Sequence, residues 1–80
     1  MIKITMYREP YFITYVLRGI PRLGEEGKAL KAAGWSWASG RPGAWVIHNQ
    51  NTAEQTAKRL NAQIEDITQE IKSMEYRRAV

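Results

Sequence analysis

All three tryptophans of the chain fall in one short segment, which constrains the fold more than any other feature of the sequence. Trp35 and Trp37 lie in one alternating apolar run, Trp45 lies in a second, and residues 39–43 between them are rich in glycine and proline. Two such runs around a turn-forming segment predict a β-hairpin over residues 35–47. Side chains two positions apart in a strand share a face, so the hairpin can supply a large part of the buried apolar area.

The size and composition of the chain predict one small globular domain over residues 1–80. The 80 residues include no cysteine, so neither disulfides nor thiolate metal sites can stabilise this domain. The 44% of hydrophobic and 25% of charged residues are typical of a folded chain. No apolar run is long enough to span a bilayer, and the N-terminal residues lack the apolar core of a signal peptide. We therefore expect a cytoplasmic protein without a membrane partner.

Periodicity and turn residues indicate two further strands and a short helix before the hairpin. Residues 2–7 and 11–18 alternate with a period of two on either side of Pro10, which predicts two more strands. Residues 24–33 are acidic at their start and are followed by Gly34, which predicts a short helix. With a second helix after the hairpin, the order β-β-α-β-β-α predicts a small α+β fold. Its expected form is an antiparallel four-stranded sheet with both helices on one face.

The C-terminal third shows the most regular apolar pattern. Residues 52–75 predict one long helix, packed beside the sheet and short helix of residues 1–50 and followed by a short tail at residues 76–80. The apolar spacing alternates between four and three residues, as in a coiled coil. A helix of ~36 Å is longer than a domain of ~30 Å diameter, so one end is expected to project. The residues predicted to mediate self-association are Leu60, Ile64, Ile67, Ile71 and Met74. Packing of the whole stripe within its own domain, or against a different protein, stays open.

Residues that usually carry catalysis or bind metals are scarce. His48 is the only histidine and Asp66 is the only aspartate. Metal sites need clustered His, Cys or carboxylate ligands, and a nucleophilic hydroxyl needs a base within reach. Residues 40–43 lack the pattern of a phosphate-binding loop, and Pro42 removes an amide donor. The sequence therefore predicts a binding protein that is not an enzyme and that uses no metal or other cofactor.

The charge balance and the aromatic content favour an anionic partner. Twelve Lys and Arg against eight Asp and Glu give a net charge of +4. Exposed aromatic rings beside cations would form a stacking platform with phosphate contacts, which is the usual arrangement for binding single-stranded nucleic acid. A double-stranded partner is also possible. The candidate residues are Lys3, Arg8, Arg18, Arg22, Lys28, Lys31, Arg41, Tyr15 and Trp37. The alternative is that the tryptophans belong to the core and the cations to a solvated surface.

Residues 24–47 resemble a group of small modules found in phage and plasmid proteins, often beside helicases, primases or DNA-modifying enzymes. Their helix–hairpin signature, L-K-x-x-G-[FW]-x-W followed by A-W, is matched by Leu30-Lys31-Ala32-Ala33-Gly34-Trp35-Ser36-Trp37 and by Ala44-Trp45. The segment is also similar, less closely, to the HARP module of annealing helicases, a small nucleic-acid-binding unit. The resemblance implies a DNA-binding accessory protein of a mobile genetic element. It also implies that Leu30, Gly34, Trp35, Trp37 and Trp45 mainly define the fold.

A second function, from a different class, fits the same features. The chain could be a protein-binding regulator of the kind that phages use to inhibit or redirect a host complex, including inhibitors of host defence. Small size and a projecting apolar helix suit such a role as well as they suit nucleic-acid binding. A pull-down from host lysate after nuclease treatment separates the two, because only a direct protein partner would survive the nuclease.

Overall fold

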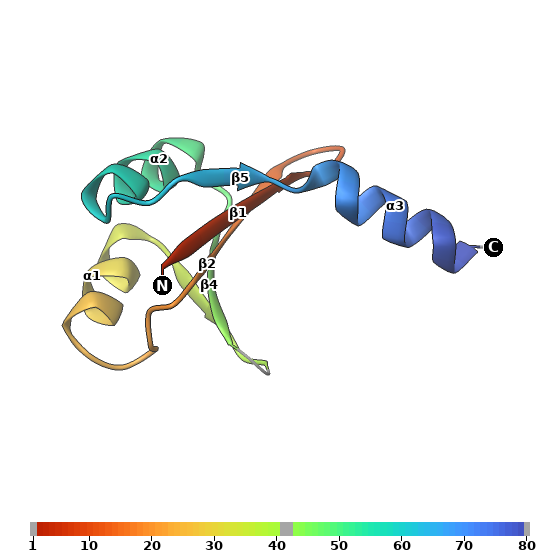
Figure 1. Cartoon of the computed structure of the whole chain (residues 1–80). Coiled ribbons are helices and arrows are strands. Elements are labelled where there is room, and N and C mark those ends of the chain that lie inside the picture. The colour runs from red at the N-terminus through yellow and green to blue at the C-terminus, as the bar shows by residue number, and fades with distance from the viewer. Residues whose placement is uncertain (1, 41–42, 80) are drawn as a thin grey trace.

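Five strands form one mixed sheet at the centre of the fold (Figure 1). Across the sheet they lie in the order β3 (Ser36–Ala38), β4 (Ala44–Ile47), β2 (Ile13–Arg18), β1 (Lys3–Arg8) and β5 (Ile64–Asp66). The first four are antiparallel to their neighbours, whereas β5 pairs with β1 in parallel. The computed structural model describes the backbone of residues 2–40 and 43–79 and the side-chain burial within these ranges up to residue 73.

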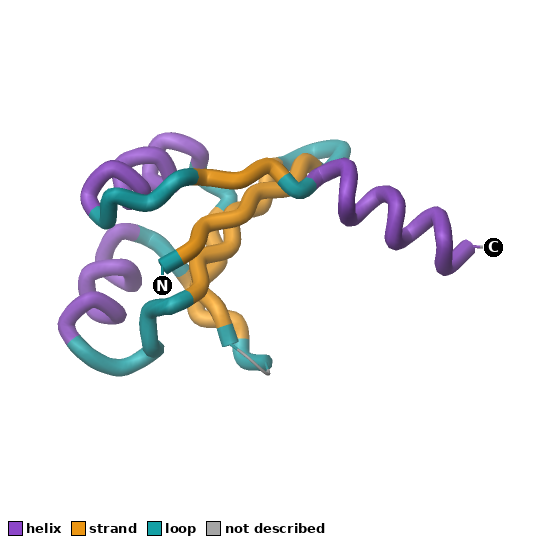
Figure 2. The backbone as a smooth tube through the Cα atoms, viewed as in Figure 1, coloured by secondary structure: helices purple, strands orange, loops and turns teal. Residues whose placement is uncertain are grey.

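Two of the three helices cover one face of this sheet. α1 (Glu25–Ala33) and α2 (Gln50–Arg59) contribute to the same core as the strands, and both lie on the same side of the sheet in Figure 2. α3 (Thr68–Ala79) begins beside the end of β1 and projects away from the other elements. With α3 included, the molecule measures 44 × 26 × 23 Å. The expected α+β class is therefore confirmed, while only the α2 part of the predicted second helix lies on the same face as α1.

The predicted hairpin and short helix are present close to their expected bounds. β3 pairs with β4, with Trp37 opposite Trp45, so the tryptophan-rich segment is a hairpin. Gly34 ends α1 in the left-handed conformation (φ 113°), which glycine adopts without steric cost. The amide of the next residue, Trp35, then donates to the carbonyl oxygen of Leu30 (3.0 Å), which closes the helix end and leads Trp35 into the core.

The prediction of one long helix over residues 52–75 is wrong, and so is the four-stranded antiparallel sheet. α2 ends at Arg59, and Asn61 adopts a positive φ of 53°, which turns the chain out of the helix. Ile64 then pairs in register with Ile4, so the outer edge of β1 gains a fifth strand. The spacing of four and three residues thus runs across a helix, a strand and a second helix, of which α2 and β5 contribute apolar side chains to the same core.

The predicted self-association stripe is divided by this break and does not form one helix face. Leu60 and Ile64 are partly buried and pack against the core of their own chain. Ile67 and Ile71 are half-buried where β5 passes into α3. The side chain of Met74 lies outside the described residues. Self-association of the chain stays a prediction, without the continuous heptad seam on which it was based.

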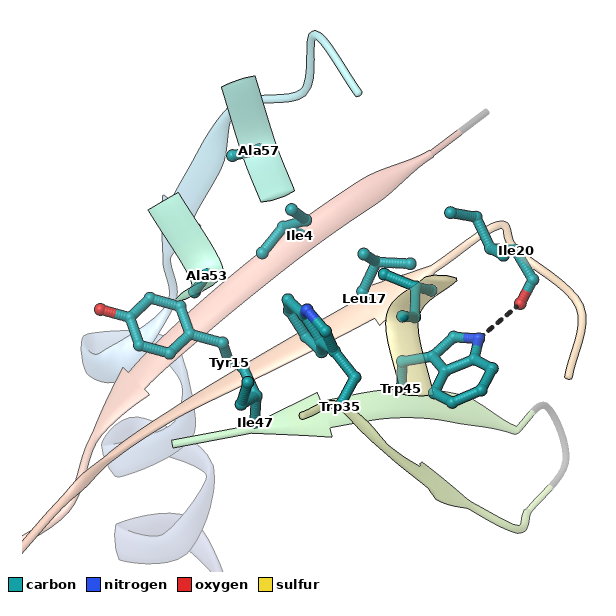
Figure 3. Packing of buried hydrophobic residues seen from close by; sticks show 10 residues of the cluster. Ile4, Tyr15, Leu17, Ile20, Trp35, Trp45, Ile47, Ala53 and Ala57 are labelled. Carbon is teal, nitrogen blue, oxygen red and sulfur yellow. Dashed lines mark hydrogen bonds between the residues drawn. The ribbon is translucent and has the colours of Figure 1, made fainter. Parts of the chain in front are cut away.

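The core lies between the sheet and the two covering helices (Figure 3). Trp35 is 2% exposed, and its Nε1 donates to Oγ1 of Thr56 on α2 (3.1 Å). Trp45 is equally buried, and its Nε1 donates to the carbonyl oxygen of Ile20 (3.2 Å). The core role expected for these two rings is thus confirmed. The other buried members are Ile4, Tyr15, Leu17, Ile20, Leu30, Ile47, Ala53 and Ala57.

The opposite face of the sheet is not covered by α1 or α2. Because strand side chains alternate between faces, the neighbours of the buried Ile4 and Leu17 point to this open side. Val16 and Val46 face each other in register there and are half-buried, while Lys3 and Arg18 form an exposed pair at one end. In the part of the chain that the structure describes, no helix is long and apolar enough to cross a bilayer.

A polar network fixes the start of α3 to the end of β1. Asp66 accepts from the backbone amide of Thr68 (2.9 Å) and from its hydroxyl (2.5 Å), and Oγ1 of Thr68 in turn accepts from the amide of Arg8 (2.9 Å). The hydroxyl of Thr68, its amide, and the nearby Arg8 guanidinium all hold the pKa of Asp66 below its ordinary value of 3.8.

This network predicts a pH-dependent effect of Asp66→Asn. A lowered pKa means that the ionised carboxylate stabilises the folded state above the ordinary value of 3.8. That contribution is lost as the pH falls from 3.8 through the lowered pKa. We therefore expect Asp66→Asn to lower the urea midpoint at neutral pH, and the wild type and the variant to converge in acid. A constant difference across the whole pH range would contradict this role of the carboxylate.

Candidate nucleic-acid interface

Three of the predicted cations surround one hollow beside α1. Arg22, in the loop before the helix, and Lys28 and Lys31, one turn apart on the helix, line a hollow of about 250 Å³. Trp45 lies at its wall, and Leu23, Gly24 and Gly27 complete the lining, which contains no acidic side chain. Arg22, Lys28 and Lys31 are all exposed. We call this group of residues the basic pocket.

Close packing of the loop against α1 places Arg22 beside the two lysines. Gly27 is buried, and a Cβ atom at this position would overlap the backbone oxygen of Arg22. The hydrogen bond from Trp45 to the carbonyl of Ile20 ties the start of the same loop to the sheet. Gly24 turns the chain into the helix with a φ of 115°, a conformation that favours glycine. The position of Arg22 is therefore set by the fold.

Gly27→Ala tests this packing. The added methyl group forces the loop and helix apart, and we expect it to lower the free energy of unfolding by about 1–3 kcal/mol, as overpacking usually does. Ala29→Ser, on the exposed side of the same helix, is the matched control and is expected to change stability by no more than about 0.5 kcal/mol. Equal urea midpoints for Gly27→Ala and the control would show that the loop does not lie against the helix as described.

The ion pair between α1 and α2 does not involve the cations of the basic pocket. Glu26, in the first turn of α1, is paired with Arg59 of α2 (2.9 Å between Oε2 and Nη1). Both partners are about half exposed, so this pair contributes little stability, but it engages the carboxylate. Glu25 is exposed beside it and is the other acidic residue of the helix. The pocket thus keeps three cations facing solvent around one hollow.

Among the other predicted cations that the structure describes, Lys3, Arg8 and Arg18 do not line the basic pocket. Lys3 is paired with Glu65 (3.2 Å), and Arg8 lies 3.7 Å from a carboxylate oxygen of Asp66 at the other end of β1. Arg18 lies opposite Lys3 on the open face of the sheet. Arg41 falls outside the described residues.

The two aromatic residues predicted to stack on bases, Tyr15 and Trp37, differ in their exposure to solvent. Tyr15 is 2% exposed within the core, so its predicted role as a stacking surface is wrong, and burial raises the pKa of its hydroxyl. The side chains of β2 alternate between the two faces of the sheet, and Tyr15 lies on the face that α1 and α2 cover. Trp37 is half-buried, with its ring edge-on to Trp45 at 5.3 Å between centroids. Trp37 thus contacts Trp45, which lines the basic pocket, but Trp37 itself is not part of that lining.

Two exposed aromatic residues were missed among the candidates. Tyr11 is 95% exposed and Phe12 is 47% exposed, in the turn between β1 and β2. The sequence placed both inside a strand over residues 11–18, whereas β2 begins at Ile13. Pro10 was the sequence signal for the exposure of these two residues, because a turn that begins at a proline can extend over the two following residues.

Comparison with family models, with curated proteins and with solved structures gives no match to this chain. Within the described ranges, no three His, Asp or Glu side chains come together in a group that could hold a metal ion. The function is therefore inferred from the geometry of the chain itself.

Proposed function

We propose that this chain is a non-enzymatic nucleic-acid-binding module that holds the phosphate backbone at the basic pocket. The observation that carries the proposal is the convergence of Arg22, Lys28 and Lys31 around one hollow with no acidic side chain in its lining. The Arg22 guanidinium can donate two parallel hydrogen bonds to one phosphate, and the lysines act as point charges on the same or the next phosphate.

The dimensions of the hollow favour a phosphate of a chain over a small ligand. Sites for small molecules usually enclose about 300–1,000 Å³ and bury most of the surface of the ligand. The basic pocket has about 250 Å³, and its three cations are exposed. An extended polyanion can place a phosphate there while the rest of it continues across the surface, so the binding energy comes largely from release of counterions.

The resemblance of residues 24–47 to nucleic-acid-associated modules supports the same proposal. Its signature residues include Lys31 in the basic pocket, Trp45 at its wall, and Gly34, which ends α1. On this proposal the module is an accessory protein of a mobile element, in which α1 and the loop before it present the cations and the hairpin supplies Trp45 at the wall of the pocket.

Binding of labelled oligonucleotides tests the proposal directly. Fluorescence anisotropy with single- and double-stranded probes of about 16 nucleotides is expected to show saturable binding at roughly 50 mM salt. An analogue of the same base sequence with an uncharged backbone is the matched control, and it should bind much more weakly. Absence of binding to every charged probe would contradict the proposed function.

A further inference from the structure

The turn between β1 and β2 presents two adjacent aromatic rings to solvent. Tyr11 is 95% exposed and Phe12 is 47% exposed. Scattered apolar side chains are ordinary on protein surfaces, but here two aromatic residues follow each other at one turn. We call Tyr11 and Phe12 the aromatic tip.

Hydrogen bonds and ring packing hold the aromatic tip in place. The amide of Glu9 donates to the carbonyl of Phe12 (2.8 Å), and the Phe12 ring packs edge-on against His48 (4.9 Å, 72°). Nδ1 of His48 lies 3.3 Å from the carbonyl oxygen of Ile13 and 3.4 Å from Oγ1 of Thr14, and that hydroxyl donates to Glu9 (2.9 Å). The Thr14 hydroxyl uses its proton to donate to Glu9, and the Ile13 carbonyl oxygen can only accept. Nδ1 of His48 is therefore the donor in its contacts with these two oxygens. The backbone of the turn and the Phe12 ring are thus preordered, which lowers the entropy cost of binding.

A shallow hollow of about 550 Å³ lies against the tip. Besides the tip itself, its lining includes Arg8, Glu9, His48 and Gln50. The amide nitrogen of Gln50 donates to Glu54 (3.1 Å), which leaves the Gln50 carbonyl oxygen free to accept.

The charges around this hollow do not favour an anion, because Arg8 is outnumbered by Glu9 and Asp66. Arg8 lies 3.7 Å from a carboxylate oxygen of Asp66, and Glu9 adds a negative charge. An isolated phosphate gains little in such surroundings, whereas a flat, uncharged ring can stack on the tip and use the polar atoms at its rim.

We propose that the aromatic tip stacks on unpaired bases, so that the nucleic acid held by this protein is single-stranded. The inference rests on the proposed function, since it takes nucleic acid as the partner. Bases in a duplex are stacked on each other, and only unpaired bases can be splayed onto protein rings. The tip precedes β2, and the loop that leads to the basic pocket follows it, so the two lie toward opposite ends of this strand (Figure 1). The six residues of β2 alone span about 17 Å. A bound strand that reaches both would have its phosphates held at one end of β2 and a base stacked at the other.

Two substitutions at Tyr11 separate base stacking from other uses of the tip. Tyr11→Phe keeps the aromatic face, and Tyr11→Leu keeps an apolar side chain but removes that face. Because Tyr11 is 95% exposed, both variants are expected to fold as the wild type does. The two probes are a labelled oligothymidylate and an abasic oligonucleotide of the same length and charge.

Wild type and Tyr11→Phe are expected to bind oligothymidylate on the order of tenfold more tightly than the abasic strand. Tyr11→Leu is expected to lose most of this preference, with its affinity for the abasic strand unchanged. If all three proteins show the same preference for bases, or none shows any, the stacking inference is overturned while phosphate binding and the proposed function stand. If neither probe binds at low salt, the proposed function fails, and the stacking inference fails with it.

Discussion

Replacing Trp35 by alanine is expected to lower the free energy of unfolding by about 3–5 kcal/mol, the usual cost of truncating a buried tryptophan. The ring is 2% exposed at the junction of the sheet, α1 and α2. Its loss also removes the donor that satisfies Oγ1 of Thr56 (3.1 Å), which is itself buried. A chain of 80 residues is stable by about 4–12 kcal/mol in total, so this variant should be close to unfolding at room temperature.

Urea denaturation followed by circular dichroism measures this loss. Trp35→Phe, which keeps an aromatic ring but not the hydrogen bond, should lie between the wild type and Trp35→Ala. Leu23→Ala is the control, because Leu23 is 81% exposed and its truncation should change stability by no more than about 0.5 kcal/mol. If Trp35→Ala costs as little as this control, Trp35 is not at the centre of the core.

The double substitution Lys28→Gln, Lys31→Gln is expected to weaken binding to a single strand by on the order of thirtyfold at about 0.1 M salt. Both lysines are exposed at the rim of the basic pocket. Each phosphate contact on a single strand contributes about 0.7 to the slope of log affinity against log salt, and the loss follows from two such contacts. Glutamine keeps the length and helix propensity of the side chains, so α1 should remain intact.

The matched control removes the same number of charges from the open face of the sheet. Lys3→Gln, Arg18→Gln lowers the net charge of +4 by two, as the first double variant does. Lys3 is already paired with Glu65 (3.2 Å), and both residues lie on the face that α1 does not cover. We expect anisotropy titrations to show a much smaller loss for this control. A larger loss in the control than in the α1 variant would indicate that the nucleic acid binds to the open face of the sheet and not to the basic pocket.

Local patterns in the sequence were sufficient to predict the elements that are close to their partners along the chain. The hairpin, the first two strands and the helix ending at Gly34 each depend on alternation, turn residues or capping within a short stretch. The fifth strand could not be found in this way, because Ile64 pairs with Ile4 at the other end of the chain. Asn61 was the one local signal for the break, since asparagine tolerates the positive φ found there.

The candidate site was predictable in part for the same reason. Lys28 and Lys31 share one side of a helix, and their spacing alone places them together. Arg22 joins them only because Gly27 allows its loop to lie against that helix. Tyr15 could not be assigned to the core, because the choice between the two faces of β2 depends on where the helices pack. Such contacts depend on the assembled fold and leave no pattern in a short stretch of sequence.

The salt dependence of binding to one single-stranded probe tests the central claim most directly. We predict that log affinity falls linearly with log salt, and that Lys28→Gln, Lys31→Gln reduces the magnitude of the slope by about 1.4. The Lys3→Gln, Arg18→Gln control should retain the wild-type slope. Equal slopes for the wild type and the α1 variant would contradict the claim that the basic pocket holds the phosphate backbone.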